Sequence, residues 1–223
     1  MKKVLIFGGS GQIGRHLIRR LTKENYLVTV VTRNYHKNGA ILKTQGNPGY
    51  IDVVEANIFD EEKLDDLFED KDICINLVGI LYEDKKNTFK NIHVNFPSLL
   101  STKCKKYNLK KLIHISALGV ERALDSKYAI SKAQGEKNII QNFLKTVILR
   151  PSIIYSVDDN FTTNLMTILS LLPVFPLYYN GKTKFSPIHV SNFCEIILKI
   201  INKNISDQII ECIGPEELSF KEI

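Results

Sequence analysis

Short apolar runs alternate with amphipathic patterns along most of the chain. Residues 4–7 are Val-Leu-Ile-Phe without polar alternation, which predicts a parallel strand buried on both faces. After this run, apolar residues recur at helical spacing, at Ile13, Leu17, Ile18 and Leu21. Strands that alternate with helices predict an α/β fold, a doubly wound parallel sheet with helices on both faces. Further strands are predicted at 27–31, 51–54, 73–78, 112–116 and 146–149.

Three other segments carry predictions of their own. The polar, glycine-containing stretch 34–50 predicts a loop, and the apolar stretch 193–201 predicts a helix. Ser219 and Glu222 have the S-x-x-E spacing of a capping box, which predicts the start of a helix. A helix that starts there would need further residues, so we expect the sequence to lack a C-terminal portion. A chance occurrence of S-x-x-E is the alternative.

A glycine-rich turn joins the first strand to the first helix, with Gly8, Gly11 and Gly14 in the spacing GxxGxxG. Unpaired N–H groups and the positive end of the helix dipole converge there, and glycines let a phosphate approach the main chain. The turn therefore predicts a pyrophosphate site for a dinucleotide; an ordinary tight strand-to-helix turn is the alternative. The expected contacts are Gly8, Ser10, Gly11, Gln12, Ile13 and Gly14.

The end of the second strand bears on which dinucleotide is bound. An acidic residue there would hydrogen-bond a ribose 2′-hydroxyl, whereas a basic residue accommodates a 2′-phosphate. This chain has Arg33, with His36 and Lys37 close behind. The sequence therefore predicts NADP(H) in preference to NAD(H), with a merely solvated arginine as the alternative.

Candidate catalytic residues follow the fifth strand. Ser116 ends that strand, at the edge where open α/β sheets bind ligands. Tyr128 and Lys132 are four residues apart, so on a helix they share one face. A nearby ammonium favours the phenolate, so we expect Lys132 to lower the pKa of Tyr128 from about 10. Tyr128 then becomes a proton donor or acceptor for a carbonyl or alcohol, and Ser116 polarises the oxygen.

Taken together, GxxGxxG, the serine-ended strand and the YxxxK of Tyr128 and Lys132 resemble the short-chain dehydrogenase/reductase superfamily. Residues 149–155, Leu-Arg-Pro-Ser-Ile-Ile-Tyr, are similar to the LRPxxxYG segment of its extended members, with Ser156 in place of the glycine. Nearly the whole chain resembles the atypical branch that includes the NAD(P)H-binding accessory subunit of respiratory complex I and its bacterial relatives. The resemblance implies a Rossmann-type NAD(P)-binding domain over 1–150. It also implies a small substrate or partner region over 151–223, interleaved with the first domain.

The resemblance also implies roles for particular residues. It places Asn57 and Ile58 at the adenine, Val78 and Gly79 along the nicotinamide-side ribose, and Arg150 and Pro151 beside the nicotinamide. Lys132 would also bind that ribose, and Asn95 would help to hold a water near Lys132. Many extended members have a second serine where this chain has Ala117, so Ser126 is the substitute for Ser116.

Composition limits which classes of binding partner and which cellular compartment we expect for the protein. The chain has 223 residues and a net charge of +6, but its one dense basic run, Lys103 to Lys111, lacks an aromatic platform. We therefore expect that run to be a solvated face and expect no nucleic-acid partner. No apolar run is long enough to span a bilayer, although 165–179 is apolar enough for a partner or a membrane surface. The four scattered cysteines suggest neither disulfides nor a metal site, and fit a reducing cytoplasm. Because of the apolar segment 165–179, we expect a position peripheral to the inner membrane.

Two classes of function fit these residues. The first is an NAD(P)-dependent oxidoreductase or epimerase-like enzyme that acts on an unidentified apolar substrate, favoured because tyrosine and lysine occur together. The second is a non-catalytic NADPH-binding accessory or assembly protein, favoured by the complex I resemblance and the missing second serine. A redox-sensing module is a third class that no residue specifically favours.

Overall fold

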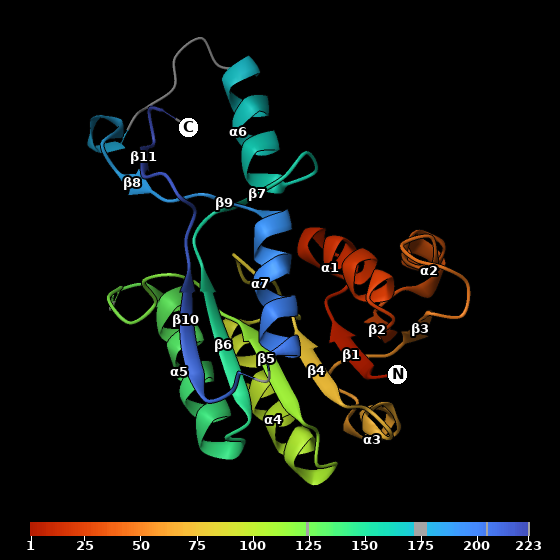
Figure 1. Cartoon of the computed structure of the whole chain (residues 1–223). Helices are drawn as coiled ribbons and strands as arrows, with labels where there is room; N and C mark the ends of the chain where they lie inside the picture. Colours follow the sequence, from red (N-terminus) through yellow and green to blue (C-terminus); the bar gives the residue numbers. More distant parts are fainter. Residues whose placement is uncertain (124, 172–177, 204, 223) are drawn as a thin grey trace.

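Seven parallel strands form one sheet in the computed structural model, which describes residues 1–123, 125–171, 178–203 and 205–222. The strand order is β10-β6-β5-β4-β1-β2-β3, so the chain winds outward first on one side of β1 and then on the other (Figure 1). All pairings in this sheet are parallel, which brings the carboxyl ends of the strands to one edge. The predicted doubly wound α/β fold is confirmed. The strands are β1 (Lys3–Phe7), β2 (Leu27–Thr32), β3 (Ile51–Glu55), β4 (Ile73–Asn76), β5 (Lys111–Ile115), β6 (Thr146–Pro151) and β10 (Gln208–Cys212).

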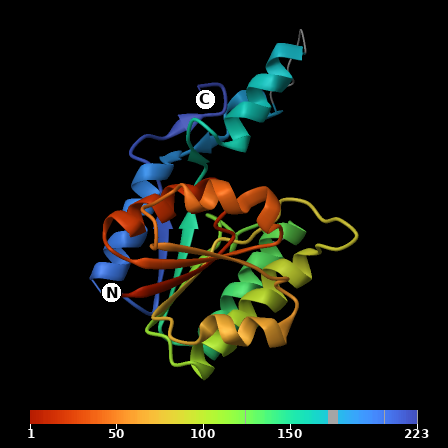
Figure 2. The same cartoon turned by 90° about the vertical axis from the view of Figure 1, so that its right-hand side faces the viewer.

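Helices cover both faces of the sheet (Figure 2). On one face, Leu17 of α1 and Phe193 of α7 are fully buried in a common apolar core. On the other face, Phe7 packs against Phe68 and Phe96, with ring centroids 6.1 and 5.3 Å away. These elements are α1 (Gln12–Lys23), α2 (Tyr35–Lys43), α3 (Glu61–Phe68), the π-helical turn η1 (Lys90–Asn95), α4 (Phe96–Lys106), α5 (Lys127–Asn142) and α7 (Val190–Asn202).

A smaller region lies above the carboxyl ends of the strands (Figure 1). Two short strand pairs form it, β7 with β9 in parallel and β8 with β11 antiparallel, and α6 projects from it. The chain then returns to the main sheet through α7 and β10, so residues 151–223 divide between the small region and the main core. The elements of the small region are β7 (Ile154–Tyr155), α6 (Asn160–Leu171), η2 (Tyr178–Gly181), β8 (Lys184–Phe185), β9 (Ile188–His189) and β11 (Leu218–Ser219).

The loop predicted over 34–50 is wrong for its first half, which forms α2. The Asn34 side chain accepts a hydrogen bond from the Lys37 N–H at 2.9 Å and so caps the helix. Leu42 is fully buried in the core beneath it. A good cap and one buried leucine therefore outweigh the polar composition that suggested a loop.

The basic run from Lys103 to Lys111 is not uniformly solvated, so that expectation is also wrong in part. Lys103 is 6% exposed, and its ammonium lies 2.7 Å from the Asp65 carboxylate. Lys111 is 2% exposed and donates to the Ile200 carbonyl at 2.7 Å. Both side chains serve the internal packing of the fold, where each ammonium has an oxygen partner.

Only one of the two hydrogen bonds of the predicted capping box is present, the one that the Glu222 side chain accepts. The Glu222 carboxylate accepts from the Ser219 N–H at 2.8 Å and from its hydroxyl at 2.6 Å. The serine hydroxyl therefore donates to the carboxylate and does not accept from main chain, and the described residues 220–222 are a turn. Of the apolar stretch 165–179, residues 172–177 lie outside the described part. No helix among the described residues has the length and apolar character needed to cross a membrane.

Candidate active site

The glycine turn lies where β1 ends and α1 begins. Gly8 has a φ of +80°, which L side chains rarely adopt, and its carbonyl accepts from the Gly11 N–H at 3.2 Å. A Cβ on Gly14 would lie only 2.4 Å from the Gly9 backbone, so glycine is needed for the close approach of helix and turn. The N-cap residue of α1 is Gly11, which offers no side-chain cap. The first-turn N–H groups of α1 therefore have no capping side-chain oxygen, which is the arrangement that suits an anion site.

A cavity of about 260 Å³ opens beside this turn. Its walls come from the carboxyl ends of β1, β2, β3 and β4, as expected for a ligand site in an open parallel sheet. Seven of the predicted cofactor residues line it: Gly8, Ser10, Gly11, Arg33, Ile58, Val78 and Gly79. The structure thus brings the glycine turn, the end of the second strand and the residues after β4 around one space.

The adenosine-side residues differ in how they face that space. Arg33 is exposed on the cavity wall, and no hydrogen bond or ion pair in the described part of the chain occupies its guanidinium. Its positive charge helps to lower the pKa of Asp84, after the larger effect of hydrogen bonds from Asn87 and Lys86. Ile58 is buried in the cavity wall, whereas Asn57 is exposed and does not line the cavity. The Asn57 side-chain oxygen accepts from the Phe59 N–H at 3.1 Å, so its structural role is local.

Lys132 lies behind the wall of this cavity, against the lining residue Gly79. Its side chain is 4% exposed, and its ammonium donates to the Ile115 carbonyl at 3.0 Å. A Cβ on Gly79 would lie 3.3 Å from the Lys132 Nζ, so the ammonium is directly beside the Gly79 main chain. Burial lowers the pKa of Lys132 to about 8, although Glu136 opposes this shift. The group can therefore change protonation near neutral pH, which is unusual for a lysine.

Tyr128 lies on the same helix, one turn before Lys132. Burial raises the pKa of Tyr128 above its usual value of 10.0. The expected lowering by Lys132 is therefore wrong for this structure, because desolvation of the phenolate dominates and the ammonium donates to Ile115 instead. A raised pKa keeps the phenol protonated at neutral pH, which suits a proton donor.

Ser116 follows directly on β5, as predicted. Its N–H donates to the Leu149 carbonyl at 2.7 Å, and its side chain is 5% exposed. The Ser116 hydroxyl has no hydrogen-bond partner among the described residues. Ser126, the alternative candidate for the catalytic serine, already has a hydrogen-bond partner: its side chain caps α5 by accepting from the Ala129 N–H at 3.3 Å. The unpaired hydroxyl makes Ser116 the better candidate for contact with a ligand oxygen.

Asn95 and Arg150, two of the predicted site residues, have their partners away from Ser116, Tyr128 and Lys132. Asn95 is exposed at the end of the π-helical turn η1, and its amide donates to the Asn91 side chain at 3.1 Å. The Arg150 guanidinium forms a two-point pair with the buried Glu136, at 3.0 and 2.7 Å, and a third contact with Glu121 at 2.8 Å. Arg150 is therefore committed to carboxylates of its own chain. Pro151, the last residue of β6, accepts from the Leu118 N–H at 3.0 Å through its carbonyl.

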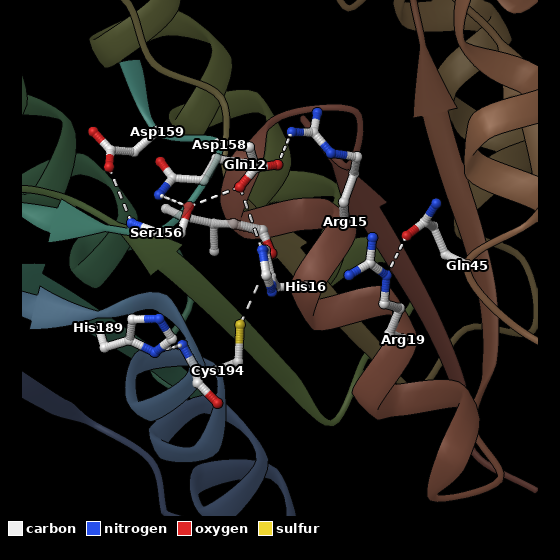
Figure 3. A network of polar contacts seen from close by, with 12 residues as sticks. Gln12, Arg15, His16, Arg19, Gln45, Ser156, Asp158, Asp159, His189 and Cys194 are labelled. Atoms are coloured by element: carbon white, nitrogen blue, oxygen red, sulfur yellow. Dashed lines mark hydrogen bonds and ion pairs between the residues drawn. The ribbon is translucent and has the colours of Figure 1, made fainter. Parts of the chain in front are cut away.

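The loop after β7 lies against the first turn of α1 (Figure 3). Gln12 donates to the Ser156 hydroxyl at 2.8 Å, and Arg15 donates both to the Ser10 carbonyl at 2.8 Å and to the Asp158 carboxylate. The hydrogen bond from Arg15 holds the pKa of Asp158 well below its usual range. We call Gln12, Arg15, Ser156 and Asp158 the loop clasp, because they join the glycine turn to the small region.

Two buried histidines beside Lys132 are absent from the sequence prediction. His93 of η1 is 1% exposed and lies against Tyr128, with ring centroids 5.3 Å apart. His114 of β5 pairs with Asn76 of β4 at 3.0 Å, and its Nε2 has no partner among the described residues. Neither histidine belongs to a motif; the available signal was only a polar ring within an otherwise apolar strand or helix pattern.

A second cavity, of about 420 Å³, lies within the small region. Its lining is mainly apolar, with the carboxylates of Glu216 and Glu222 as the charged groups. Among the described residues of this lining there is no lysine or arginine. Its other residues are Ile153, Tyr155, Phe161, Thr162, Pro187, Pro215 and Leu218.

The glycine turn, the seven-stranded sheet and the YxxxK helix define a class of dinucleotide-fold protein. The sequence matches the NAD dependent epimerase/dehydratase family over residues 4–212, and the chain belongs to that family. This family lies within the short-chain dehydrogenase/reductase superfamily, so the superfamily predicted from the sequence is confirmed.

Similar proteins include mitochondrial subunits of NADH-ubiquinone oxidoreductase. The chain is 24% identical over 220 residues to the mitochondrial NADH-ubiquinone oxidoreductase 40 kDa subunit of Neurospora crassa, covering 98% of this chain and 57% of that protein. It is 29% identical over 218 residues to the NADH dehydrogenase (ubiquinone) 1 alpha subcomplex subunit 9 of Dictyostelium discoideum, covering 97% and 60%. The chain thus spans less than two thirds of either relative.

Solved structures share the fold. The dTDP-glucose 4,6-dehydratase of Bacillus anthracis, determined in complex with NAD, superposes with a TM-score of 0.81 at 19% identity. That match covers 100% of this chain and 78% of the dehydratase. At this level of identity the likeness concerns the fold, and the Rossmann-type architecture is confirmed by it.

Proposed function

We propose that the protein binds a nicotinamide dinucleotide along the first cavity, with NADP(H) preferred over NAD(H). The glycine turn holds the pyrophosphate, Ile58 contacts the adenine, and Arg33 faces the ribose 2′ position. The proposal is supported by the exposed, unoccupied guanidinium of Arg33 on the cavity wall, since a free arginine there suits a 2′-phosphate. Arg150 is left out of it, because its guanidinium is paired with Glu136 and Glu121. Asn57 stays a candidate adenine contact, since its side-chain oxygen accepts from Phe59 and has a second lone pair.

We further propose an oxidoreductase reaction at the Lys132 end of the cavity. The observation that carries this proposal is the position of the Lys132 ammonium against Gly79, one helical turn from Tyr128. A bound reduced nicotinamide supplies a hydride to a carbonyl carbon. Tyr128 donates its proton to the carbonyl oxygen, so that carbonyl, hydride and proton give an alcohol; in the reverse direction Tyr128 accepts the proton. Ser116 donates a hydrogen bond to the same oxygen, and Lys132, whose ammonium lies beside Gly79, would hold the nicotinamide ribose.

An apolar substrate suits the second cavity better than a sugar nucleotide does. A diphosphate needs basic partners, and the charged groups that line this cavity are the carboxylates of Glu216 and Glu222. Apolar side chains such as Ile153, Phe161 and Leu218 instead favour a carbonyl compound with a hydrocarbon body.

A second function is supported by the relatives. Both respiratory-chain subunits named above match over nearly the whole of this chain. A non-catalytic role, in which the protein retains NADPH as an accessory or assembly element, therefore stays the alternative. The exposed apolar residues Met166, Leu169 and Leu171 of α6 would then meet a protein partner. Under either function we propose a cytoplasmic location, peripheral to the inner membrane, in keeping with four free, buried cysteines.

One experiment separates the two functions. The purified protein is analysed for co-purifying nucleotide, and oxidation of its bound reduced nicotinamide is followed with a panel of quinones, ketones and nucleotide sugars. If turnover occurs, Tyr128→Phe should lower it by about a hundredfold or more without changing cofactor affinity. Tyr50→Phe is the matched control, because the Tyr50 hydroxyl contacts Asn25 at the opposite edge of the sheet. Tight NADPH retention without any turnover supports the accessory role, and turnover unaffected by Tyr128→Phe excludes Tyr128 as the proton donor.

A further inference from the structure

We propose that His93 is a positioning residue of the site, which fixes the Gly79–Ile80 main chain against the Tyr128–Lys132 face of α5. This inference rests on the proposed function for its catalytic consequence, but its structural core can be tested without any ligand. His93 lies on η1, between the strand end that borders the cavity and the helix that carries the proposed proton donor.

Two hydrogen bonds define the tautomer of His93. The Ile80 N–H donates to Nε2 at 3.1 Å, so Nε2 carries no proton. Nδ1 therefore carries the proton and donates to the Ser131 hydroxyl at 2.9 Å, and that hydroxyl donates to the Tyr128 carbonyl at 2.7 Å. A continuous chain of hydrogen bonds thus runs from the Ile80 amide through one neutral imidazole to the main chain of Tyr128.

The imidazole also stays neutral over the range of pH in which a cell operates. Burial, and then the positive charge of Lys132, lower the pKa of His93 to about 3. A second proton would be placed on Nε2, which faces a donor, so protonation would break the link to Ile80. The position of the two elements is therefore insensitive to physiological pH.

Packing fixes the ring and its helix from the other sides. The Tyr128 ring stands edge-on to His93 at 5.3 Å and 88°, and Phe89 stacks on the imidazole at 5.3 Å and 18°. The main chain is held just as closely, because a Cβ on Gly135 would lie 1.9 Å from the His93 carbonyl. Any shift of His93 would therefore move either Tyr128 or the turn of α5 that follows Lys132.

Two variants separate hydrogen bonding from packing. His93→Gln offers an oxygen to the Ile80 N–H and an amide N–H to Ser131, so it can restore both bonds. His93→Phe keeps a ring between Phe89 and Tyr128 but restores neither bond. The first readout is hydrogen exchange at the Ile80 amide in the protein without added nucleotide. The second is the dissociation constant of NADPH compared with that of 2′-phospho-ADP-ribose, which lacks the nicotinamide.

We expect His93→Phe to speed exchange at Ile80 and to weaken NADPH binding, each by about tenfold, as for a lost buried hydrogen bond. Binding of 2′-phospho-ADP-ribose should stay within about twofold, because its contacts lie elsewhere. His93→Gln should restore both values. Unchanged exchange at Ile80 in His93→Phe, or equal losses in the Gln and Phe variants, would overturn the inference.

The outcomes also separate this inference from the proposed function. If the wild-type protein binds neither nucleotide, the proposed function fails, while the exchange at Ile80 still decides the role of His93. If the Phe variant does not fold, nitrogen NMR of the wild-type imidazole decides it. A protonated Nδ1 and an unprotonated Nε2 from pH 5 to 9 support the inference, and a protonated Nε2 contradicts it.

Discussion

The two ends of the proposed dinucleotide site are built in opposite ways. At the nicotinamide end, Lys132 and His93 are 4% and 1% exposed, and each has a fixed hydrogen-bond partner. At the adenosine end, Arg33 is exposed and its guanidinium is free of hydrogen bonds in the described chain. The buried end is thus preorganised before a ligand arrives, whereas the exposed end supplies charge.

This difference determines what each end can contribute. A charge enclosed in protein has a shifted pKa and a large effect on a neighbouring proton, as the value of about 8 for Lys132 indicates. An exposed charge is screened by solvent and salt, so under the proposed function we expect Arg33 to affect the choice of cofactor and to have little influence on the chemistry. Changes at the buried end should therefore alter the reaction, and changes at the exposed end should alter selectivity.

The largest effect is expected from Lys132→Met, which removes the ammonium but keeps the length of the side chain. Turnover should fall by about a hundredfold or more, because no ammonium would then hold the nicotinamide ribose in position beside Tyr128. Steady-state kinetics with the substrate found in the panel measure this change. Lys127→Met is the matched control, because Lys127 is exposed on the same helix. Equal turnover in both variants would mean that the buried end has no special role.

Lys132→Met also tests whether the Lys132 charge is buried, through the pH dependence of the free energy of unfolding. Folded Lys132 loses its proton near pH 8, whereas in the unfolded chain it stays protonated up to about pH 10.5. Between these values the unfolded state binds more protons, so the stability of the wild type rises with pH. Relative to Lys132→Met, this rise should reach up to about 3 kcal/mol at pH 10.5. Urea unfolding of both proteins at several pH values measures it, and parallel curves would contradict the buried charge.

A moderate and selective effect is expected from Arg33→Ala. Loss of the guanidinium should weaken NADPH binding by about tenfold and leave NADH binding nearly unchanged, because NADH lacks the 2′-phosphate. Fluorescence titration of the bound reduced nicotinamide measures both constants. Lys37→Ala, a nearby exposed cation, is the control for general electrostatics. An equal loss for both dinucleotides would remove the distinction between the two ends.

The smallest effect is expected at the loop clasp, from Asp158→Asn. Asp158 is 44% exposed at its side chain, so its pair with Arg15 should contribute less than about 1 kcal/mol to stability. This contribution is present above the usual pKa of a free aspartate and is lost as the pH falls below it, because the folded pKa is depressed. Thermal unfolding at pH 7 and pH 3 measures it. A loss of NADPH binding beyond about tenfold would instead make the clasp part of the binding site itself.

Much of the fold was predictable because its signals are local. The apolar run before Gly8 predicts β1, and the spacing of Ile13, Leu17, Ile18 and Leu21 predicts α1. The helix α2 was missed because its stability comes from one cap at Asn34 and from burial of Leu42, which depends on the finished core. Buried lysines such as Lys111 were missed for a related reason, since the Ile200 carbonyl that receives its ammonium is 89 residues away.

The site residues also differ in whether local spacing or tertiary packing determines them. The glycine turn and the Tyr128–Lys132 pair follow from spacing within one element. The structure places Gly8 and Gly11 in the wall of the cavity, and it places Lys132 against Gly79 of the same wall. The carboxylate partners of Arg150 depend on how α5 and the loop before it pack against β6, and the direction of the Tyr128 pKa depends on burial. None of these can be obtained from spacing along the chain.

The central claim is that this cavity binds a nicotinamide dinucleotide with the phosphate of NADPH at Arg33. Equilibrium titration of the nucleotide-free wild-type protein with NADPH and with NADH, followed by nicotinamide fluorescence, tests it most directly. We predict saturable binding of one dinucleotide per chain, with NADPH bound about tenfold more tightly than NADH. Equal affinities would contradict the role of Arg33, and no saturable binding of either dinucleotide would contradict the claim as a whole.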